Sequence, residues 1–280
     1  MDKINTNSIL KRLQNKGFYK LLSVGTKWMY KVKGKDIKSV NYLNELAIWE
    51  FKIGQDYFYS SGPGWAYDYN YLMHEFSTHL GFQYLPKMGD CVVDVGAGVG
   101  EELMIFSKLV GSSGKVYAIE AHPKTFKALK YNQEKNAFDN TELLHLAIAD
   151  SPGHIFIEDT PDSLANKVSQ EQHADSFKVG AITIEQLIEK YTIQQVDFMK
   201  VNIEGAEQLL IKGIGKAIGK IKNMAISCHD FRYQNEGIEF FKTKKIVLEF
   251  LQDSNFECIT RTTGNPLLDD YVYAFPRENK

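Results

Sequence analysis

The sequence predicts an α/β protein built around a doubly wound, mostly parallel sheet. Two patterns support this prediction. From about residue 91, short continuous apolar runs alternate with amphipathic segments, and a glycine-rich turn directly follows the first apolar run. Alternation of strand-like and helix-like segments is typical of parallel strands that are joined by helical crossovers.

Five apolar runs are interpreted as the strands of this sheet. Short, continuous runs of this kind fit parallel strands that are buried on both faces. They cover residues 91–95, 115–120, 142–149, 196–201 and 223–228. Between them, apolar residues recur at three- and four-residue spacing, which predicts crossover helices. The expected helices cover 101–110, 125–136, 183–191 and 207–218.

The C-terminal part follows another pattern. A longer helix is expected over 238–255, and two strand-like runs follow at 256–262 and 270–275. The residues between these runs include the turn formers Gly264, Asn265 and Pro266. Because such residues reverse the chain, we expect an antiparallel hairpin here.

The first 84 residues lack the regular alternation. A short helix is expected near 9–13, ending before Gly17. The stretch 56–71 is rich in aromatic residues, and the glycine and proline at its centre predict an irregular loop. We therefore expect residues 1–84 to form a cap and substrate lid over the ligand edge of the sheet, and residues 85–280 to form the main domain.

Two aromatic residues of this cap are candidates for contact with a substrate. Trp65 and Tyr67 lie beside Gly62, Pro63 and Gly64, and aromatic faces can stack on sugars or flat rings and exclude water. Aromatic residues in this stretch can equally pack the cap onto the sheet.

Composition excludes several classes of protein. The 33 basic and 35 acidic residues give a net charge of −2, so there is no overall field that attracts nucleic acid. No apolar run is long enough to cross a bilayer, and the N-terminus lacks the apolar core of a signal peptide, so we expect a cytoplasmic protein with no membrane partner. Cys91, Cys228 and Cys258 are expected to be structural thiols.

The glycine turn at residues 96–100 predicts a ligand site. Gly96, Gly98 and Gly100 permit a tight turn and close approach of a ligand to the backbone. Their G-x-G-x-G spacing differs from the G-x-G-x-x-G of dinucleotide-binding turns. Glu101 and Glu102 follow, and two carboxylates would repel a pyrophosphate but suit a ligand that carries a sulfonium and an ammonium group; equally, they complement the helix dipole.

An acidic residue at the end of the second strand fits the same ligand. Glu120 can accept hydrogen bonds from both ribose hydroxyls of a nucleoside. The end of the third predicted strand would then lie beside an adenine. The expected cofactor-contacting residues are Asp94, Gly96, Ala97, Gly98, Gly100, Glu101, Glu120, Ala121, Ala147 and Ile148.

These segments, taken in order, resemble the FkbM family of S-adenosylmethionine-dependent methyltransferases. The resemblance covers about 85–275 and rests on DVGAGVG, YAIEAHP, AIADSPG, ITIEQLIEKY, VDFMKVNIEGAEQLLIKG and AISCHD. It implies a Rossmann-like class I methyltransferase fold over 85–280, with a mostly parallel seven-stranded sheet that a C-terminal antiparallel hairpin closes. It also implies methyl transfer, commonly to an oxygen of a sugar or secondary metabolite. The chain has Asn202 and Ser227 where the family usually shows Asp and often Glu.

The ends of the fourth and fifth strands face the methyl group in this architecture, and they carry the residues that we call the acceptor cluster: Lys200, Asn202, Glu204, His229 and Asp230. His229 is the expected base, because a histidine pKa of about 6.5 suits removal of a hydroxyl proton. Lys200, if desolvated, is an alternative base. Asp230 is expected to orient His229 or bind substrate, Asn202 to bind substrate, and Glu204 to hold a sugar hydroxyl or cap the next helix.

Other interpretations stay open. Asn202, Glu204, His229 and Asp230 carry donors that a divalent metal such as Mg²⁺ accepts, although the neutral Asn202 weakens a metal site. The acceptor is expected to be a small molecule or a peptide, with O-methylation as the leading prediction and N-methylation of an amide or amine as the alternative. A noncatalytic module that binds a partner through its cap is a third possibility. The sequence leaves the oligomeric state open.

Overall fold

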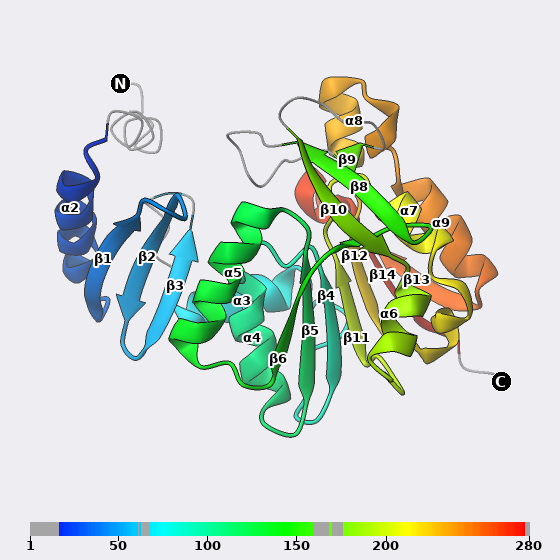
Figure 1. Cartoon of the computed structure of the whole chain (residues 1–280), viewed down its shortest axis with the longest axis horizontal. Helices are drawn as coiled ribbons and strands as arrows, with labels where there is room; N and C mark the ends of the chain where they lie inside the picture. Colours follow the sequence, from blue (N-terminus) through cyan, green and yellow to red (C-terminus); the bar gives the residue numbers. More distant parts are fainter. Residues whose placement is uncertain (1–16, 61, 63–67, 159–167, 170–175, 278–280) are drawn as a thin grey trace.

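A seven-stranded sheet forms the centre of the computed structural model, which describes residues 17–60, 62, 68–158, 168–169 and 176–277 (Figure 1). In spatial order the strands are β13 (Phe256–Thr260), β14 (Tyr271–Pro276), β12 (Met224–Ser227), β11 (Phe198–Val201), β4 (Cys91–Val95), β5 (Lys115–Glu120) and β6 (Thr141–His145). The five strands from β12 to β6 are parallel, and β14 is antiparallel to both of its neighbours. The predicted parallel sheet and C-terminal hairpin are confirmed.

Helices cover both faces of this sheet, which explains why its central strands are mostly apolar. Alternate residues of β4 point to opposite faces: Val92 packs with α4 (Glu101–Val110) and α5 (Pro123–Asn136), whereas Val93 packs with the helices of the other face. Those helices are α6 (Ile184–Lys190), α7 (Glu207–Lys212) and α9 (Lys244–Asp253).

Two predicted helices are shorter than expected. The helix expected over 207–218 divides into α7 and a 3₁₀ helix, η1 (Gly215–Lys220). The helix expected over 238–255 divides into η2 (Glu239–Phe241) and α9. Two further short helices were not predicted, α8 (Asp230–Glu236) and α10 (Pro266–Asp269), the latter inside the hairpin turn.

A second, smaller sheet flanks the first, and the sequence patterns did not predict it. Its order is β7 (Ala147–Ile148), β10 (Ser176–Ile182), β8 (Gly153–Glu158) and β9 (Val168–Ser169). The single strand expected over 142–149 is therefore wrong, because the chain leaves β6 at His145 and residues 147–148 pair with β10 instead. This sheet forms one side of the cavity described below.

The N-terminal region contains helix α2 (Tyr19–Val32) and a three-stranded antiparallel sheet of β1 (Ile37–Leu43), β2 (Ile48–Ile53) and β3 (Asp56–Ser60). Helix α3 (Tyr69–Thr78) then leads into the main sheet and packs with α4. The irregular loop expected over 56–71 is wrong at both ends, because 56–60 pair with β2 and 69–71 begin α3. The helix expected near 9–13 lies outside the described residues.

The three-stranded sheet lies beside α5, and α2 lies on its far side, at the outer edge of the molecule (Figure 1). Tyr59 of β3 is buried edge-on against Tyr131 of α5. Ile48 of β2 reaches the wall of the cavity. Within the described part of the chain, no helix is long and apolar enough to cross a membrane.

Candidate active site

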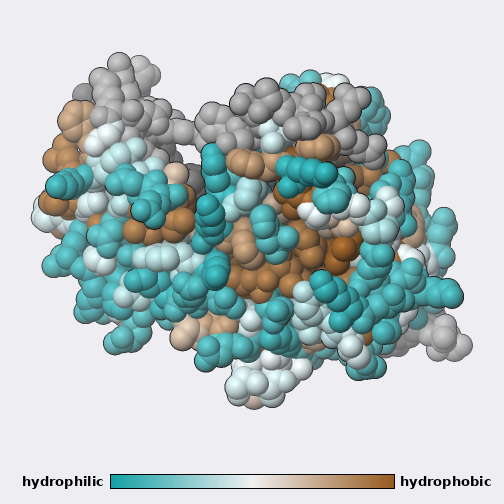
Figure 2. Space-filling view, in the orientation of Figure 1, coloured by the Kyte–Doolittle hydropathy of each residue, from teal (hydrophilic) through white to brown (hydrophobic). Residues whose placement is uncertain are grey.

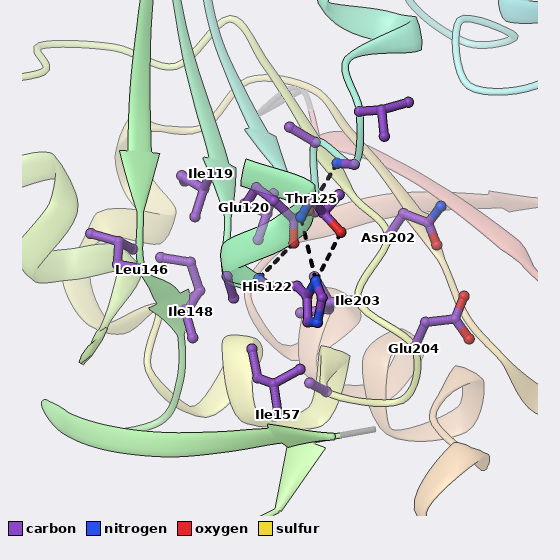
Figure 3. Close-up of a pocket in the computed structure, with 18 of the residues that line it drawn as sticks. Ile119, Glu120, His122, Thr125, Leu146, Ile148, Ile157, Asn202, Ile203 and Glu204 are labelled. Atoms are coloured by element: carbon purple, nitrogen blue, oxygen red, sulfur yellow. Dashed lines mark hydrogen bonds between the residues drawn. The ribbon is translucent and has the colours of Figure 1, made fainter. Parts of the chain in front are cut away.

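A cavity of about 450 Å³ opens at the carboxyl ends of β4 and β5 (Figure 3). In doubly wound sheets this edge is where ligands bind. The glycine turn, the end of β5, the second sheet and the turn after β11 all contribute to its wall. Of the residues expected to contact a cofactor, those that line it are Gly96, Ala97, Gly98, Glu101, Glu120, Ala121, Ala147 and Ile148.

Close packing of the backbone fixes the glycine turn. The N–H groups of Gly96 and Ala97 both donate to the carbonyl of Ile119, at 2.9 Å. Gly96 has a φ of +81°, and a Cβ atom there would lie 2.0 Å from the carbonyl oxygen of Asn202. Only glycine therefore fits this position, and the turn after β4 rests directly on the turn after β11.

Glu120 projects into the cavity from the end of β5 (Figure 3). Its Oε2 accepts a hydrogen bond from Gly98 N–H at 2.9 Å, and its Oε1 accepts one from His122 N–H at 2.7 Å. Burial raises the pKa of Glu120 to about 7 although these hydrogen bonds oppose it. Because each carboxylate oxygen has a second lone pair, the side chain can still accept from ligand hydroxyls.

Apolar side chains form the opposite part of the cavity. Leu146 and Ile148 come from the chain after β6, and Ile155 and Ile157 come from β8 of the second sheet. Figure 2 shows hydrophobic surface gathered near the centre of this face, over the region of β6 and the second sheet. The two β8 isoleucines were missed, although a short run of β-branched and aromatic residues such as the IFI of GHIFIE is a strand signal.

The described lining is acidic. It contains Glu101, Glu102, Glu120 and Glu204 but a single lysine, Lys200. Burial, reinforced by the charge of Glu102, raises the pKa of Glu101 to about 8. A ligand with positive charge would supply the missing counter-charge, whereas a pyrophosphate would add to the repulsion. The lining therefore fits the sulfonium and ammonium groups of S-adenosylmethionine.

The positive charge of Lys200 is already paired within the protein. Its Nζ lies 2.9 Å from Oδ1 of Asp94 and donates to the carbonyl of Gly96 at 2.6 Å. Burial alone would lower the pKa of Lys200, but the charges of Asp94 and Glu102 and the hydrogen bond to Asp94 together outweigh it, and the pKa is raised. Asp94 and Gly100, two of the expected cofactor residues, lie behind the lining, where Gly100 packs against Leu129 and Asn132.

Asn202 and Glu204 lie on the turn after β11, at the other end of the cavity from Leu146 (Figure 3). Glu204 has a φ of +52°, which is rare for a residue with a side chain. Its Oε2 accepts from Arg232 Nη1 at 2.6 Å, and its Oε1 lies 3.3 Å from His229 Nε2. Although burial opposes it, these two partners lower the pKa of Glu204. The carboxylate is therefore held ionised at the cavity wall.

His229 is buried between two carboxylates. Its Nδ1 lies 2.9 Å from Oε1 of Glu207, which is fully buried, and its Nε2 faces Glu204. Burial favours the neutral ring, but Glu204 and Glu207 outweigh it and raise the pKa of His229 to about 10. The expected near-neutral pKa is therefore wrong. We call Glu204, Glu207, His229 and Arg232 the histidine network.

Two further residues near His229 have roles that the sequence analysis did not predict. Asp230 was expected to orient His229 or bind substrate, but its Oδ2 accepts from the N–H groups of Thr243 and Lys244 and so caps α9. Glu207, which was not predicted, orients the histidine instead. The available signal was an acid three residues after Glu204, on the same turn into a helix.

The two aromatic candidates of the cap and the candidate metal site are the remaining predictions for this region. Trp65 and Tyr67 lie outside the described residues. Among the residues that are described, no group of three or more His, Cys, Asp or Glu side chains is arranged to hold a metal ion. Of the four residues considered for a metal, His229 has both ring nitrogens engaged by carboxylates and Asp230 accepts from the backbone.

Two curated relatives of this chain are methyltransferases. The hexuronic acid methyltransferase AglP of Haloferax volcanii is 26% identical over 140 residues, which are 50% of this chain and 56% of that protein. The chain thus matches little more than half the length of this relative. A protein-L-isoaspartate O-methyltransferase of Methanococcus maripaludis is 38% identical over 56 residues, 20% of this chain and 26% of that protein.

Aeropyrum pernix fibrillarin, solved with bound S-adenosyl-L-methionine, aligns with a TM-score of 0.43 at 14% identity, over 86% of this chain and 99% of that chain. The model of the methyltransferase FkbM domain matches residues 94–258. This match spans more than half of the sequence and includes the glycine turn, Glu120 and the histidine network, so the chain belongs to the FkbM family of S-adenosylmethionine-dependent methyltransferases.

Proposed function

We propose that this protein transfers a methyl group from S-adenosylmethionine to a hydroxyl group of a sugar or of a similar hydroxyl-rich metabolite. The observation that carries the proposal is the ionised carboxylate of Glu204, which the histidine network holds at the cavity wall. A relative that is named for methylation of a hexuronic acid supports a sugar as the acceptor.

The donor would lie along the glycine turn. S-adenosylmethionine supplies a methyl group that is bonded to a positively charged sulfur and is therefore open to attack by a nucleophile. Glu120 would accept hydrogen bonds from its ribose hydroxyls, and Ile148 and Ile157 would contact its adenine. Glu101 would face the cationic end and become ionised there, because a nearby positive charge lowers the pKa of a carboxyl group.

The acceptor would lie between the donor and the turn after β11. Asn202 and Glu204 line this side of the cavity. An ionised carboxylate accepts hydrogen bonds only, so Glu204 selects a group that donates one, such as a hydroxyl. Holding that hydroxyl in line with the carbon–sulfur bond supplies much of the rate acceleration, because a fixed geometry removes the entropy cost of alignment.

Glu204 would also receive the proton. As the acceptor oxygen bonds to the methyl carbon and the carbon–sulfur bond breaks, the hydroxyl proton becomes strongly acidic, so even a carboxylate can accept it and pass it to solvent. His229 and Lys200 are poorly suited as bases, because the pKa of each is raised. His229 and Arg232 are instead positioning residues that fix the direction of the carboxylate.

We place this reaction in the cytoplasm. Cys91, Cys228 and Cys258 are all free thiols in the structure, and free thiols are typical of reducing compartments.

The proposal is tested with a labelled methyl donor. The protein is incubated with S-adenosylmethionine that carries an isotopically labelled methyl group and with fractionated host metabolites, and labelled products are identified by mass spectrometry. We expect a labelled ether on a sugar or similar hydroxyl compound. Label on an amide or amine nitrogen would contradict O-methylation, and donor binding without any labelled product would favour a noncatalytic module.

Once the acceptor is known, Glu204→Gln tests the role of the carboxylate. Glutamine keeps the size of the side chain but cannot take a proton, so kcat should fall by about a hundredfold or more, while the Kd for S-adenosylmethionine stays unchanged. Glu239→Gln is the matched control, because Glu239 is exposed and pairs only with Lys242 among the described ion pairs. Equal kcat values for the two variants would refute the assignment.

A further inference from the structure

Helix α2 presents an apolar face to solvent. Leu21, Val24, Trp28 and Val32 are 63–69% exposed, and their spacing of three and four residues places them on one side of the helix. The opposite side, with Leu22, Thr26 and Tyr30, is buried against the three-stranded sheet. In Figure 2, hydrophobic surface gathers at the left edge, where Figure 1 places α2. Exposed apolar faces of this kind mark interaction sites.

Lysines border this apolar face. Lys20, Lys27 and Lys31 follow each other at spacings of seven and four residues, so they form a row along one flank of the exposed side chains. Helix α2 contains no acidic residue, and residues 19–38 contain six lysines and one acidic residue, although the whole chain has a net charge of −2. Positive charge is thus concentrated beside the apolar face.

We propose that α2 binds the surface of an anionic phospholipid membrane, with Leu21, Val24, Trp28 and Val32 in the boundary between headgroups and acyl chains. Apolar residues that include a tryptophan on one face, bordered by lysines, are the composition of helices that lie in this interface. The lysine stems extend along the apolar face while their ammonium groups reach the lipid phosphates. This mode is peripheral, so it requires no helix that crosses the bilayer, but it departs from the expectation that the protein has no membrane partner.

The charge of α2 favours an anionic membrane over a second copy of the chain as the partner of this apolar face. In a pair of identical helices, each α2 would meet the other's lysines without an acidic residue from the same helix to balance them. None of the ion pairs between described residues involves Lys20, Lys27 or Lys31. An anionic lipid surface supplies both the apolar layer and the negative charge that this helix lacks.

Vesicle flotation tests the proposal. The full-length protein is floated with phosphatidylcholine vesicles that contain or lack phosphatidylglycerol. We expect binding to the anionic vesicles, weaker binding to pure phosphatidylcholine, and weakening by salt, because salt screens the lysines. Leu21→Gln should lower the affinity about tenfold, since burying a leucine side chain contributes at least that factor. Replacing Lys20, Lys27 and Lys31 with glutamine should lower it about a hundredfold on anionic vesicles only.

Leu267→Gln is the matched control. Leu267 is 60% exposed, similar to Leu21 at 63%, but belongs to α10 in the C-terminal hairpin, so this variant should float like the wild type. Absence of flotation, or equal losses for the two leucine variants, would overturn the proposal. A dimer in light scattering that Leu21→Gln dissociates, without vesicle binding, would overturn it too and assign the face to a second copy.

Discussion

His229 provides the sharpest test of the electrostatics in this site. The side chain is 3% exposed and lies 2.9 Å from Glu207, which is 0% exposed, and 3.3 Å from Glu204. Replacing it with glutamine removes the positive charge between the two carboxylates. Glu204 keeps Arg232 as a partner, but Glu207 becomes a buried charge without a cation. The His229→Gln variant should therefore be much less stable than the wild type.

The size of the effect follows from the pKa of His229. A rise from the ordinary 6.5 to about 10 corresponds to roughly 5 kcal/mol of stabilisation of the charged ring. Breaking a buried ion pair by removing one partner costs about 3–5 kcal/mol. We therefore expect the free energy of unfolding to fall by about 3–5 kcal/mol in His229→Gln. In the double variant His229→Gln/Glu207→Gln the fall should be smaller, because no uncompensated carboxylate is left in the core.

Urea unfolding measures these differences, and its pH dependence identifies the group. Because the folded-state pKa is raised, the stabilisation from His229 is fully present below pH 6.5 and is lost as the pH rises to about 10. The wild type should lose stability across this window, and His229→Gln should lack that part of the slope. His154→Gln is the control, because His154 is exposed on β8. Wild-type stability in His229→Gln, or an unchanged slope, would refute the histidine network.

Three further predictions concern the donor site, and all are read by calorimetric titration with S-adenosylmethionine. Gly96→Ala should weaken binding at least about tenfold, because the added Cβ would lie 2.0 Å from the carbonyl oxygen of Asn202. Gly180→Ala is the control and should bind like the wild type, because a Cβ at that position meets nothing within 4 Å. Glu120→Gln should weaken binding about tenfold or more through weaker ribose hydrogen bonds; wild-type affinity would exclude the ribose role. The affinity for S-adenosylmethionine should rise as the pH increases through about 7–8 and then level off, and binding should be accompanied by proton release. The reason is that the cation favours the ionised forms of Glu120 and Glu101. A pH-independent affinity would contradict this prediction.

The main sheet could be predicted because its strands are buried on both faces. Residues 91–95 and 115–120 are continuous apolar runs, and their predicted bounds match β4 and β5. The second sheet could not be recognised in the same way, because only Ile155 and Ile157 of β8 are buried and the strand is not a continuous apolar run. The boundary between β6 and β7 was missed because β7 pairs with a strand more than thirty residues later in the chain.

The donor side of the site was predictable because it is local in the sequence. The glycine turn and Glu120 belong to two consecutive strand ends, and all but two of the expected cofactor residues line the cavity. The acceptor side depends on contacts between distant residues. Residue type alone suggested a histidine base, but Glu207, 22 residues earlier in the chain, changes its charge state. Asp230 likewise caps α9, a role that its residue type does not distinguish from binding substrate or orienting His229.

Calorimetric titration of the wild-type protein with S-adenosylmethionine and, separately, with NAD tests the central claim most directly. The acidic cavity behind the glycine turn should bind the cationic adenosine ligand with one site per chain and give no heat with the dinucleotide, whose pyrophosphate would face Glu101 and Glu102. Binding of NAD together with no binding of S-adenosylmethionine would contradict the assignment of the whole site.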